Sequence, residues 1–233
     1  MNKEKELEIY LSISEIKFEI YLFDIKSQEN LYKEELILKE NEDSLNLIAL
    51  KKFLDNNIFK IEKLSGKFVE NIFLIFDDKK NLNVEMGIKK KNYSVPITNG
   101  NLENSLIEAK DLFRENYQKQ EIMHMIINKY FINGKSYSSL QANLNSDDFA
   151  LEVQFKSIPN STINNLNKIL EDYQIKITKC LDGDYVKSSF DKNLELSEMS
   201  HKILKGHNEN EVTFVPKNLK KKGFFEKFFQ LFS

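Results

Sequence analysis

The sequence predicts an α/β (α+β) fold that ends in an amphipathic helix, and three patterns support this prediction. Apolar and polar residues alternate over most of residues 8–38, which is typical of an antiparallel meander of strands. Residues 71–181 then give the order β–β–β–α–β–β–α–β, as expected for a mixed sheet with helices packed on it. The last seventeen residues, 217–233, place large apolar residues at helical spacing.

Composition limits the class of protein. The chain has 233 residues, of which 41% are hydrophobic and 30% charged, so it can bury a core. Its 34 basic and 36 acidic residues leave a net charge of −2, and we therefore expect no nucleic-acid partner. A single cysteine excludes an internal disulfide and fits a reducing cytoplasm. We find no apolar run of signal-peptide or transmembrane length, so we expect a cytoplasmic protein.

The first 70 residues are expected to form three strands and a helix. Residues 8–22 read as two strands joined by a tight turn, and residues 31–38 as a third strand. Behind a cluster of capping residues, apolar residues at helical spacing predict a helix from Leu45 to about Asn57. Residues 58–69 are ambiguous, with a second helix as one interpretation.

The middle of the chain opens on residues 71–76, a nearly continuous apolar run typical of a strand covered on both faces. Residues 82–95 read as a strand pair that turns at Lys89–Lys91. The elements expected after it are a helix over 102–118 capped by Asn99 or Asn101, a strand over 121–132 before an Asn133-Gly134 turn, a strand over 149–155, a helix that starts at Pro159, a strand over 174–181, a loop over 182–192, a short helix over 194–204 and a strand over 211–215.

Residues that could carry chemistry are scarce. No glycine-rich phosphate loop and no dinucleotide-binding fingerprint occurs. His124, His201, His207 and Cys180 are scattered without metal-ligand spacing, and His124 lies among Met and Ile, where a hydrogen-bonded core histidine is expected. The sequence therefore predicts no catalytic residue, no metal, no cofactor and no enzymatic activity.

The C-terminal tail has the pattern of an in-plane membrane anchor. One face of the helix is apolar, a block of lysines precedes it, and Gly223 separates the two. The predicted membrane-binding residues are Lys220, Lys221, Lys222, Phe224, Phe225, Phe228, Phe229, Leu231 and Phe232. A helix docked on the core of its own domain is the alternative.

Several segments resemble the bacterial actin-like cell-division protein FtsA. Leu11–Phe18 lies where that family has its first phosphate loop, L-D-I-G-T/S-x-K-V, and Ile72–Cys180 follows the order of elements in the family's inserted subdomain. The resemblance implies a partial actin-like (ribonuclease H-like) lobe with an inserted small αβ subdomain, followed by a C-terminal amphipathic helix. The implied division of the chain is a remnant of the first lobe at 1–70, the inserted subdomain at 71–185, a return segment at 186–216 and the membrane-targeting helix at 217–233.

The chain departs from that family at the nucleotide site. Ser12 and Ser14 replace the Asp and Gly of the first phosphate loop, so Ser12, Ser14 and Lys17 are its degenerate positions. The second phosphate loop, D-I-G-G-G-T, has no counterpart, and too few residues follow Leu181 for a second lobe. The resemblance therefore implies a pseudo-ATPase that neither binds nor hydrolyses ATP, and FtsZ binding, which uses the second lobe, does not carry over.

The expected function is that of a non-enzymatic scaffold of bacterial cell division, peripheral to the cytoplasmic face of the inner membrane. Its expected partners are an anionic membrane surface, other cell-division proteins and further copies of itself. Two alternatives remain open: an adaptor of a pilus or secretion platform, similar to PilM, and a nucleotide-binding actin-like protein with unfamiliar motifs.

Overall fold

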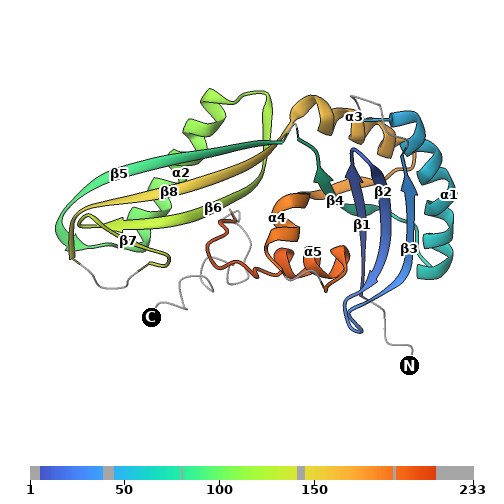
Figure 1. The fold of residues 1–233 in the computed structure, drawn as a ribbon, viewed down its shortest axis with the longest axis horizontal. Coiled ribbons are helices and arrows are strands. Elements are labelled where there is room, and N and C mark those ends of the chain that lie inside the picture. The colour runs from blue at the N-terminus through green and yellow to red at the C-terminus, as the bar shows by residue number, and fades with distance from the viewer. Residues whose placement is uncertain (1–5, 39–44, 80, 141–144, 191–192, 214–233) are drawn as a thin grey trace. The chain divides into compact units, whose positions relative to one another are not determined.

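The computed structural model describes residues 6–38, 45–79, 81–140, 145–190 and 193–213, and these form two compact units (Figure 1). The first unit combines the chain up to Asn81 with Ile158–His207. The second unit comprises Leu82–Ser157 and the described residues from Asn208 onward. The tail at 217–233, with every predicted membrane-binding residue, lies outside the described residues.

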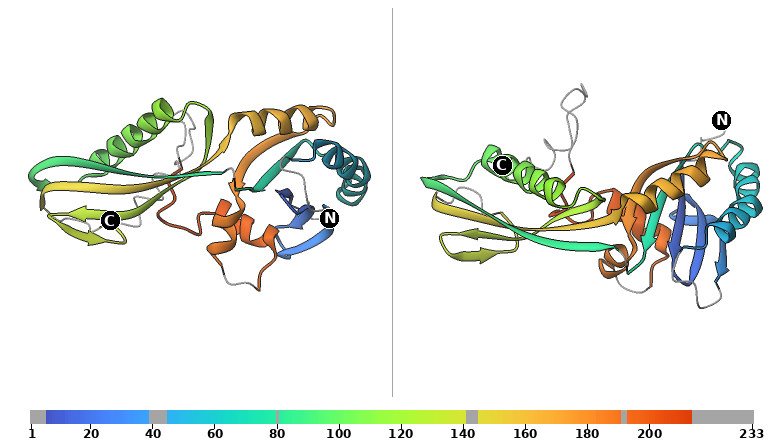
Figure 2. Two further views of the ribbon diagram at one scale, coloured as in Figure 1. Left: turned by 45° about the horizontal axis from the view of Figure 1, so that its top comes forward. Right: turned by 90° about the horizontal axis from the view of Figure 1, so that it is seen from above.

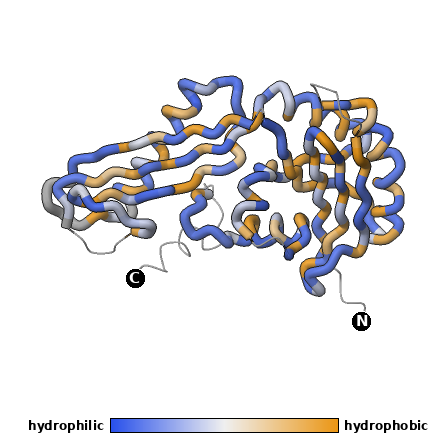
Figure 3. Tube along the Cα trace, viewed as in Figure 1, coloured by the Kyte–Doolittle hydropathy of each residue, from blue (hydrophilic) through white to orange (hydrophobic). Residues whose placement is uncertain are grey.

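The first unit is built on a five-stranded mixed sheet in the order β3-β2-β1-β4-β9. Its strands are β1 (Leu7–Ser14), β2 (Lys17–Asp24), β3 (Glu29–Ile37), β4 (Asn71–Asp77) and β9 (Lys176–Asp182). β1, β2 and β3 form the predicted antiparallel meander, while β4 runs parallel to β1 and β9 runs parallel to β4. Figure 3 shows hydrophobic and hydrophilic residues interleaved along β1 and β2.

Helices cover both faces of this sheet. Because side chains alternate between faces, Phe18 and Phe23 of β2 point to opposite sides. Phe18 packs against Phe53 of α1 (Leu47–Ser65), which lies beside α3 (Asn160–Glu171) (Figure 2). Phe23 packs against His201 of α5 (Leu196–Leu204), which lies beside α4 (Gly183–Ser188).

The predicted end of a helix near Asn57 is wrong, because α1 continues to Ser65. Asn57 is 3% exposed, and its side chain is hydrogen-bonded on both sides: Nδ2 donates to the Phe53 carbonyl of α1 at 2.7 Å, and Oδ1 accepts from the Tyr32 hydroxyl of β3 at 2.6 Å. The helix ends at Gly66, whose φ of 72° lets its N–H reach the Glu62 carbonyl.

The second unit is a four-stranded sheet in the order β5-β8-β6-β7 with one helix packed on it. Its elements are β5 (Leu82–Pro96), α2 (Asn99–Asn116), β6 (Gln120–Ile132), β7 (Lys135–Tyr137) and β8 (Asn145–Pro159). Phe113 of α2 stacks on Phe155 of β8 with ring centroids 4.7 Å apart, at the centre of the core. The predicted Asn133-Gly134 turn is confirmed, with positive φ at both residues between β6 and β7.

Long-range pairing corrects two predictions in this unit. Lys89–Lys91 is no turn, because the three lysines stay in register with Asp148–Ala150 of β8, and the Lys89 ammonium pairs with Asp148 at 2.5 Å. The cap of α2 is Thr98 rather than Asn99 or Asn101; its hydroxyl accepts from the Asn101 N–H in a capping box.

Further along the chain, the segment predicted as a loop over 182–192 contains α4. A strand is predicted over residues 211–215. Among the described residues of this segment, Glu211 forms a single antiparallel bridge, with Ile126.

The boundaries between the units also differ from the prediction. β4 and β9 belong to the first sheet, so the inserted unit begins at Leu82 and ends at Ser157 instead of spanning 71–185. The α/β fold class is confirmed. In this sheet a three-stranded meander is followed by two parallel strands, and the second unit is inserted between β4 and α3.

Candidate functional site

The carboxyl ends of the three parallel strands meet at one edge of the first sheet. Ser14 at the end of β1 lies in register with Asp77 of β4, and Phe76 of β4 pairs with Asp182 of β9. Ligands of open α/β sheets bind at such an edge. The predicted phosphate-loop positions Ser12, Ser14 and Lys17 lie at this edge or in β1 and β2 next to it. A nucleotide site would therefore be expected at this edge.

Ser14 and Lys17 come together, but they form a turn rather than an anion site. Ser14 Oγ accepts from the Lys17 N–H at 3.1 Å and donates to the Lys17 carbonyl at 3.0 Å, which closes the connection from β1 to β2. The Lys17 ammonium lies 2.9 Å from Glu19 of its own strand. Ser12 is buried opposite Glu19. The charge of Lys17 is therefore neutralised on the sheet.

Asp182 begins the helix that lies over this edge. Its carboxylate accepts from the Tyr185 N–H at 2.8 Å as the N-cap of α4 and from Asn81 Nδ2 at 3.0 Å. Asp182 is 4% exposed, so these bonds replace the water that a free carboxylate would need. Asp182 thus serves to position α4.

Asp77 is held by the same helix. Its carboxylate pairs with the Lys187 ammonium of α4. Gly183 approaches so closely that a Cβ built on it would lie 2.6 Å from Asp77 Cβ. α4 therefore occupies the space next to the end of β4. Among the described residues, no group of three or more His, Cys, Asp or Glu side chains could hold a metal ion.

A partly buried polar cluster joins α5 to the opposite end of β1. Glu8 Oε2 accepts from the Tyr10 hydroxyl at 2.5 Å and lies 2.6 Å from His201 Nδ1. Burial, with a smaller contribution from Glu8, raises the pKa of the Tyr10 hydroxyl above its ordinary value. The hydroxyl thus stays protonated as a donor, and the cluster acts as a structural contact between helix and sheet.

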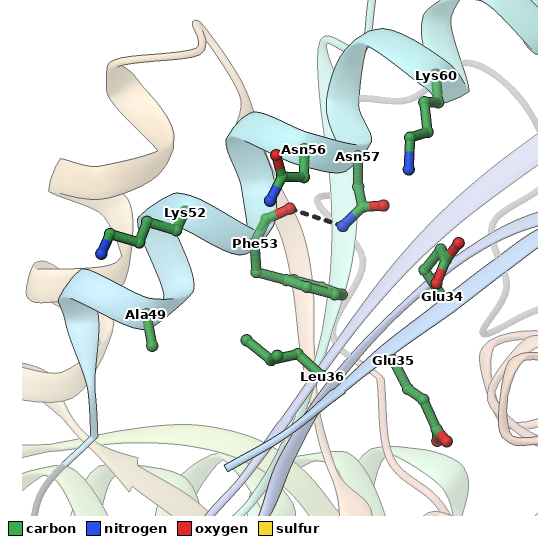
Figure 4. A pocket seen from close by; sticks show the side chains of 9 residues that line it. All are labelled: Glu34, Glu35, Leu36, Ala49, Lys52, Phe53, Asn56, Asn57 and Lys60. Atoms are coloured by element: carbon green, nitrogen blue, oxygen red, sulfur yellow. Dashed lines mark hydrogen bonds between the residues drawn. The ribbon is translucent and has the colours of Figure 1, made fainter.

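A groove of about 490 Å³ lies between the edge strand β3 and α1, and no pattern in the sequence indicates it. Phe53 and Leu36 converge on its floor (Figure 4). The lining residues are Glu34, Glu35 and Leu36 of β3 and Ala49, Lys52, Phe53, Asn56, Asn57 and Lys60 of α1. Lys52 and Lys60 form no ion pair with another described residue, although the Lys60 ammonium lies 6.0 Å from the centroid of the Tyr32 ring.

In the second unit, residues 208–213 run along β6. Glu211 forms an antiparallel bridge with Ile126, the Ile127 N–H donates to the Asn210 carbonyl at 2.9 Å, and the Val212 N–H donates to the Met125 carbonyl at 2.8 Å. This segment directly precedes the tail in the sequence.

A buried contact adds to this backbone pairing. His124 Nδ1 lies 2.8 Å from Glu211 Oε1, and both side chains are buried. The prediction of a hydrogen-bonded core histidine is confirmed. None of the described helices combines the length and the hydropathy needed to cross a bilayer.

No family model matches the chain, and no curated protein matches it either. Solved structures do show similarity. The cytoplasmic domain of EpsL, an inner-membrane component of the type II secretion system of Vibrio cholerae, aligns with 78% of this chain and 57% of its own, at 8% identity and a TM-score of 0.36. The PilM–PilN type IV pilus biogenesis complex aligns with 78% of this chain and 49% of the matched chain, at 8% identity and a TM-score of 0.48.

A protein of unknown function with an actin-like ATPase fold from Bacteroides thetaiotaomicron aligns with 78% of this chain and 54% of its own, at 14% identity and a TM-score of 0.33. The chain thus spans about half the length of the solved structures that it matches. All three TM-scores lie below 0.5, so these likenesses assign no activity or partner to the chain.

Proposed function

We propose that the protein is a non-enzymatic adaptor that is tethered to the cytoplasmic face of a membrane by its C-terminal tail. The spacing of the tail carries this proposal: six large apolar residues fall on one helical face behind Lys220–Lys222. Each lysine near an anionic surface contributes about 1 kcal/mol, which gives reversible attachment for one chain. Several copies held together would stay bound longer, because their tails act in concert.

The attachment of 208–213 to β6 supports a tether that passes through the second unit. Three residues, Phe214–Pro216, separate Thr213 from the first residue of the tail. The two backbone hydrogen bonds and the buried His124–Glu211 contact hold this segment on the sheet. The tail therefore follows the second unit directly in the chain.

The arrangement at the carboxyl edge supports a role without nucleotide chemistry. Asp182 caps α4, Asp77 pairs with Lys187, and Lys17 pairs with Glu19. Each of these charges already has a structural partner within the first unit. A thermal-shift measurement with ATP and magnesium tests this part of the proposal: we expect an unchanged melting temperature, and a rise that depends on ATP concentration would favour the nucleotide-binding alternative.

The anchor is tested by deleting Gly223–Ser233. We expect the full chain to co-sediment with vesicles that contain phosphatidylglycerol and the shortened chain to remain in the supernatant. Equal co-sedimentation of both chains would overturn the tether. It would favour the alternative in which the helix packs on its own domain.

The cellular setting that we propose is the division machinery, because the sequence resembles FtsA in the order of its elements and in its tail. A PilM-like role at a pilus or secretion platform is the alternative. The position of the fluorescently tagged protein in cells separates the two. A band at midcell is the expected result, whereas foci at the cell poles would favour the pilus or secretion platform.

A further inference from the structure

The outer edge of β3 has backbone groups available for another strand. Among the described residues β3 pairs with β2 alone. The Leu38 N–H donates to the Ile16 carbonyl at 2.8 Å, which fixes the alternation of the antiparallel ladder: Leu36 and Glu34 also point their backbone groups toward β2. The alternate residues Lys33, Glu35 and Ile37 therefore direct their N–H and C=O groups to the outer edge.

Native proteins usually shield such an edge, yet most of this strand is exposed. Ile37 is 72% and Leu36 36% exposed. Beside this edge lies the groove of about 490 Å³, within the size range of pockets that hold small ligands or a few side chains. A helix that borders an open edge strand is the setting in which domains bind extended peptides by strand addition.

The residues that line the groove differ in character from place to place, so they favour different peptide side chains at different positions. Phe53 and Leu36 form the apolar floor of the groove, and its helix side carries Lys52 and Lys60 (Figure 4). Neither lysine forms an ion pair with another described residue. Glu34 and Glu35 line the strand side, so we expect acidic ligand groups to favour the side of the helix.

The spacing of the two lysines matches that of a strand. Lys52 and Lys60 are eight residues apart, which is about 12 Å along a helix axis. In an extended peptide, residues i and i+4 point to the same face and lie about 13 Å apart. In a peptide bound along β3, we expect an acidic residue at each of these positions to reach one lysine, and residue i+2 between them to contact Phe53 and Leu36.

We propose that β3 and α1 bind an extended peptide of a partner protein by strand addition, and that the peptide carries an acidic residue, an apolar residue and an acidic residue at i, i+2 and i+4. This proposal rests on the proposed adaptor function and adds to it the kind of partner that the adaptor binds. It uses no part of the tail, so the two proposals fail independently.

The test uses the full chain in solution without vesicles and a fluorescently labelled peptide of sequence T-E-T-L-T-E-T. We expect a rise in fluorescence anisotropy that weakens with salt, and no rise for T-K-T-L-T-K-T or T-E-T-S-T-E-T. Lys60→Glu should weaken binding at least about tenfold, because it replaces a charge-assisted contact with a repulsive one. Lys63→Glu, an equal charge change at an exposed site one turn further along α1, should bind as the unaltered chain does.

A second measurement tests whether the peptide pairs with β3 as an added strand. Amide hydrogen exchange at Lys33, Glu35 and Ile37 should slow when the glutamate peptide is added. Glu35→Pro should abolish binding, because it removes an outward N–H while leaving the bonds to β2 in place.

The proposal is overturned if the unaltered chain fails to bind the glutamate peptide, if the lysine peptide binds equally well, or if Lys60→Glu has no effect. It is also overturned if the three amides are protected in the free protein by a concentration-dependent dimer, since a second copy would then cover the edge.

Discussion

Glu211 Oε1 lies 2.8 Å from His124 Nδ1, and this buried contact joins the segment before the tail to β6 of the second unit. The pair is eighty-seven residues apart in sequence, so its bond closes a long loop. In the proposed function the contact lies on the path through which a membrane-bound tail would hold the body. Its removal is therefore expected to affect both stability and attachment of this segment.

His124→Leu should lower the free energy of unfolding by about 2–3 kcal/mol, because it leaves the buried Glu211 carboxylate without its histidine. Urea unfolding measures this cost. The double variant His124→Leu with Glu211→Met should recover most of it, since a buried polar pair can often be exchanged for apolar groups of similar size. A double variant less stable than His124→Leu would contradict this account of the pair.

Gly183→Ala should destabilise the protein by about 1–3 kcal/mol, because its Cβ would lie 2.6 Å from Asp77 Cβ and 3.3 Å from Asp77 Cα. The backbone of β4 cannot move aside without disturbing the sheet. Gly100→Ala in α2 is the matched control, since its Cβ would meet nothing nearer than 3.7 Å. Thermal unfolding of the two variants compares them directly. Equal melting temperatures would show that α4 packs less closely on β4 than described.

Stability should fall at alkaline pH in a way that depends on Tyr130. Burial raises the pKa of its hydroxyl from 10.0 to about 12 in the folded protein. The folded state therefore keeps a proton that the unfolded state loses, so the resulting stability is complete below pH 10 and is lost as pH rises toward 12. Urea unfolding across this range should give a shallower fall for Tyr130→Phe than for the unaltered chain. Parallel curves would contradict the prediction.

Local patterns predicted the elements whose residues alternate or repeat without interruption. The meander of β1, β2 and β3 follows from apolar alternation, and the turn after β6 follows from Asn133-Gly134, which adopts positive φ readily. β4 was found because it is a short apolar run covered on both faces. These signals lie within single segments, which is why the sequence alone reveals them.

Pairing between distant segments explains the errors. Lys89–Lys91 resembles a polar turn until β8 supplies Asp148 and a continuous ladder. Asn57 resembles a helix end until the Tyr32 hydroxyl satisfies its side chain. The boundary predicted at 70/71 failed for the same reason, because the pairing of β4 with β1 joins segments on either side of it.

The candidate sites were even less accessible from sequence. Ser14 and Lys17 are close because they form the turn between β1 and β2. Only the folded structure reveals that Glu19 neutralises the charge of Lys17. The groove between β3 and α1 combines residues that are ordinary in their own segments. The fold reveals it by bringing Leu36 and Phe53 together beside the outer edge of β3, which pairs with no further strand of the described residues.

The most direct test of the tether is co-sedimentation of the double variant Phe228→Glu with Phe229→Glu with phosphatidylglycerol vesicles. Both substitutions place charge on the apolar face of the predicted helix. Gln230→Glu with Ser233→Glu adds the same two charges to the polar face and serves as the control. We expect the apolar-face variant to remain in the supernatant while the control still binds. Equal binding of the two variants would contradict a tail that holds the protein on the membrane.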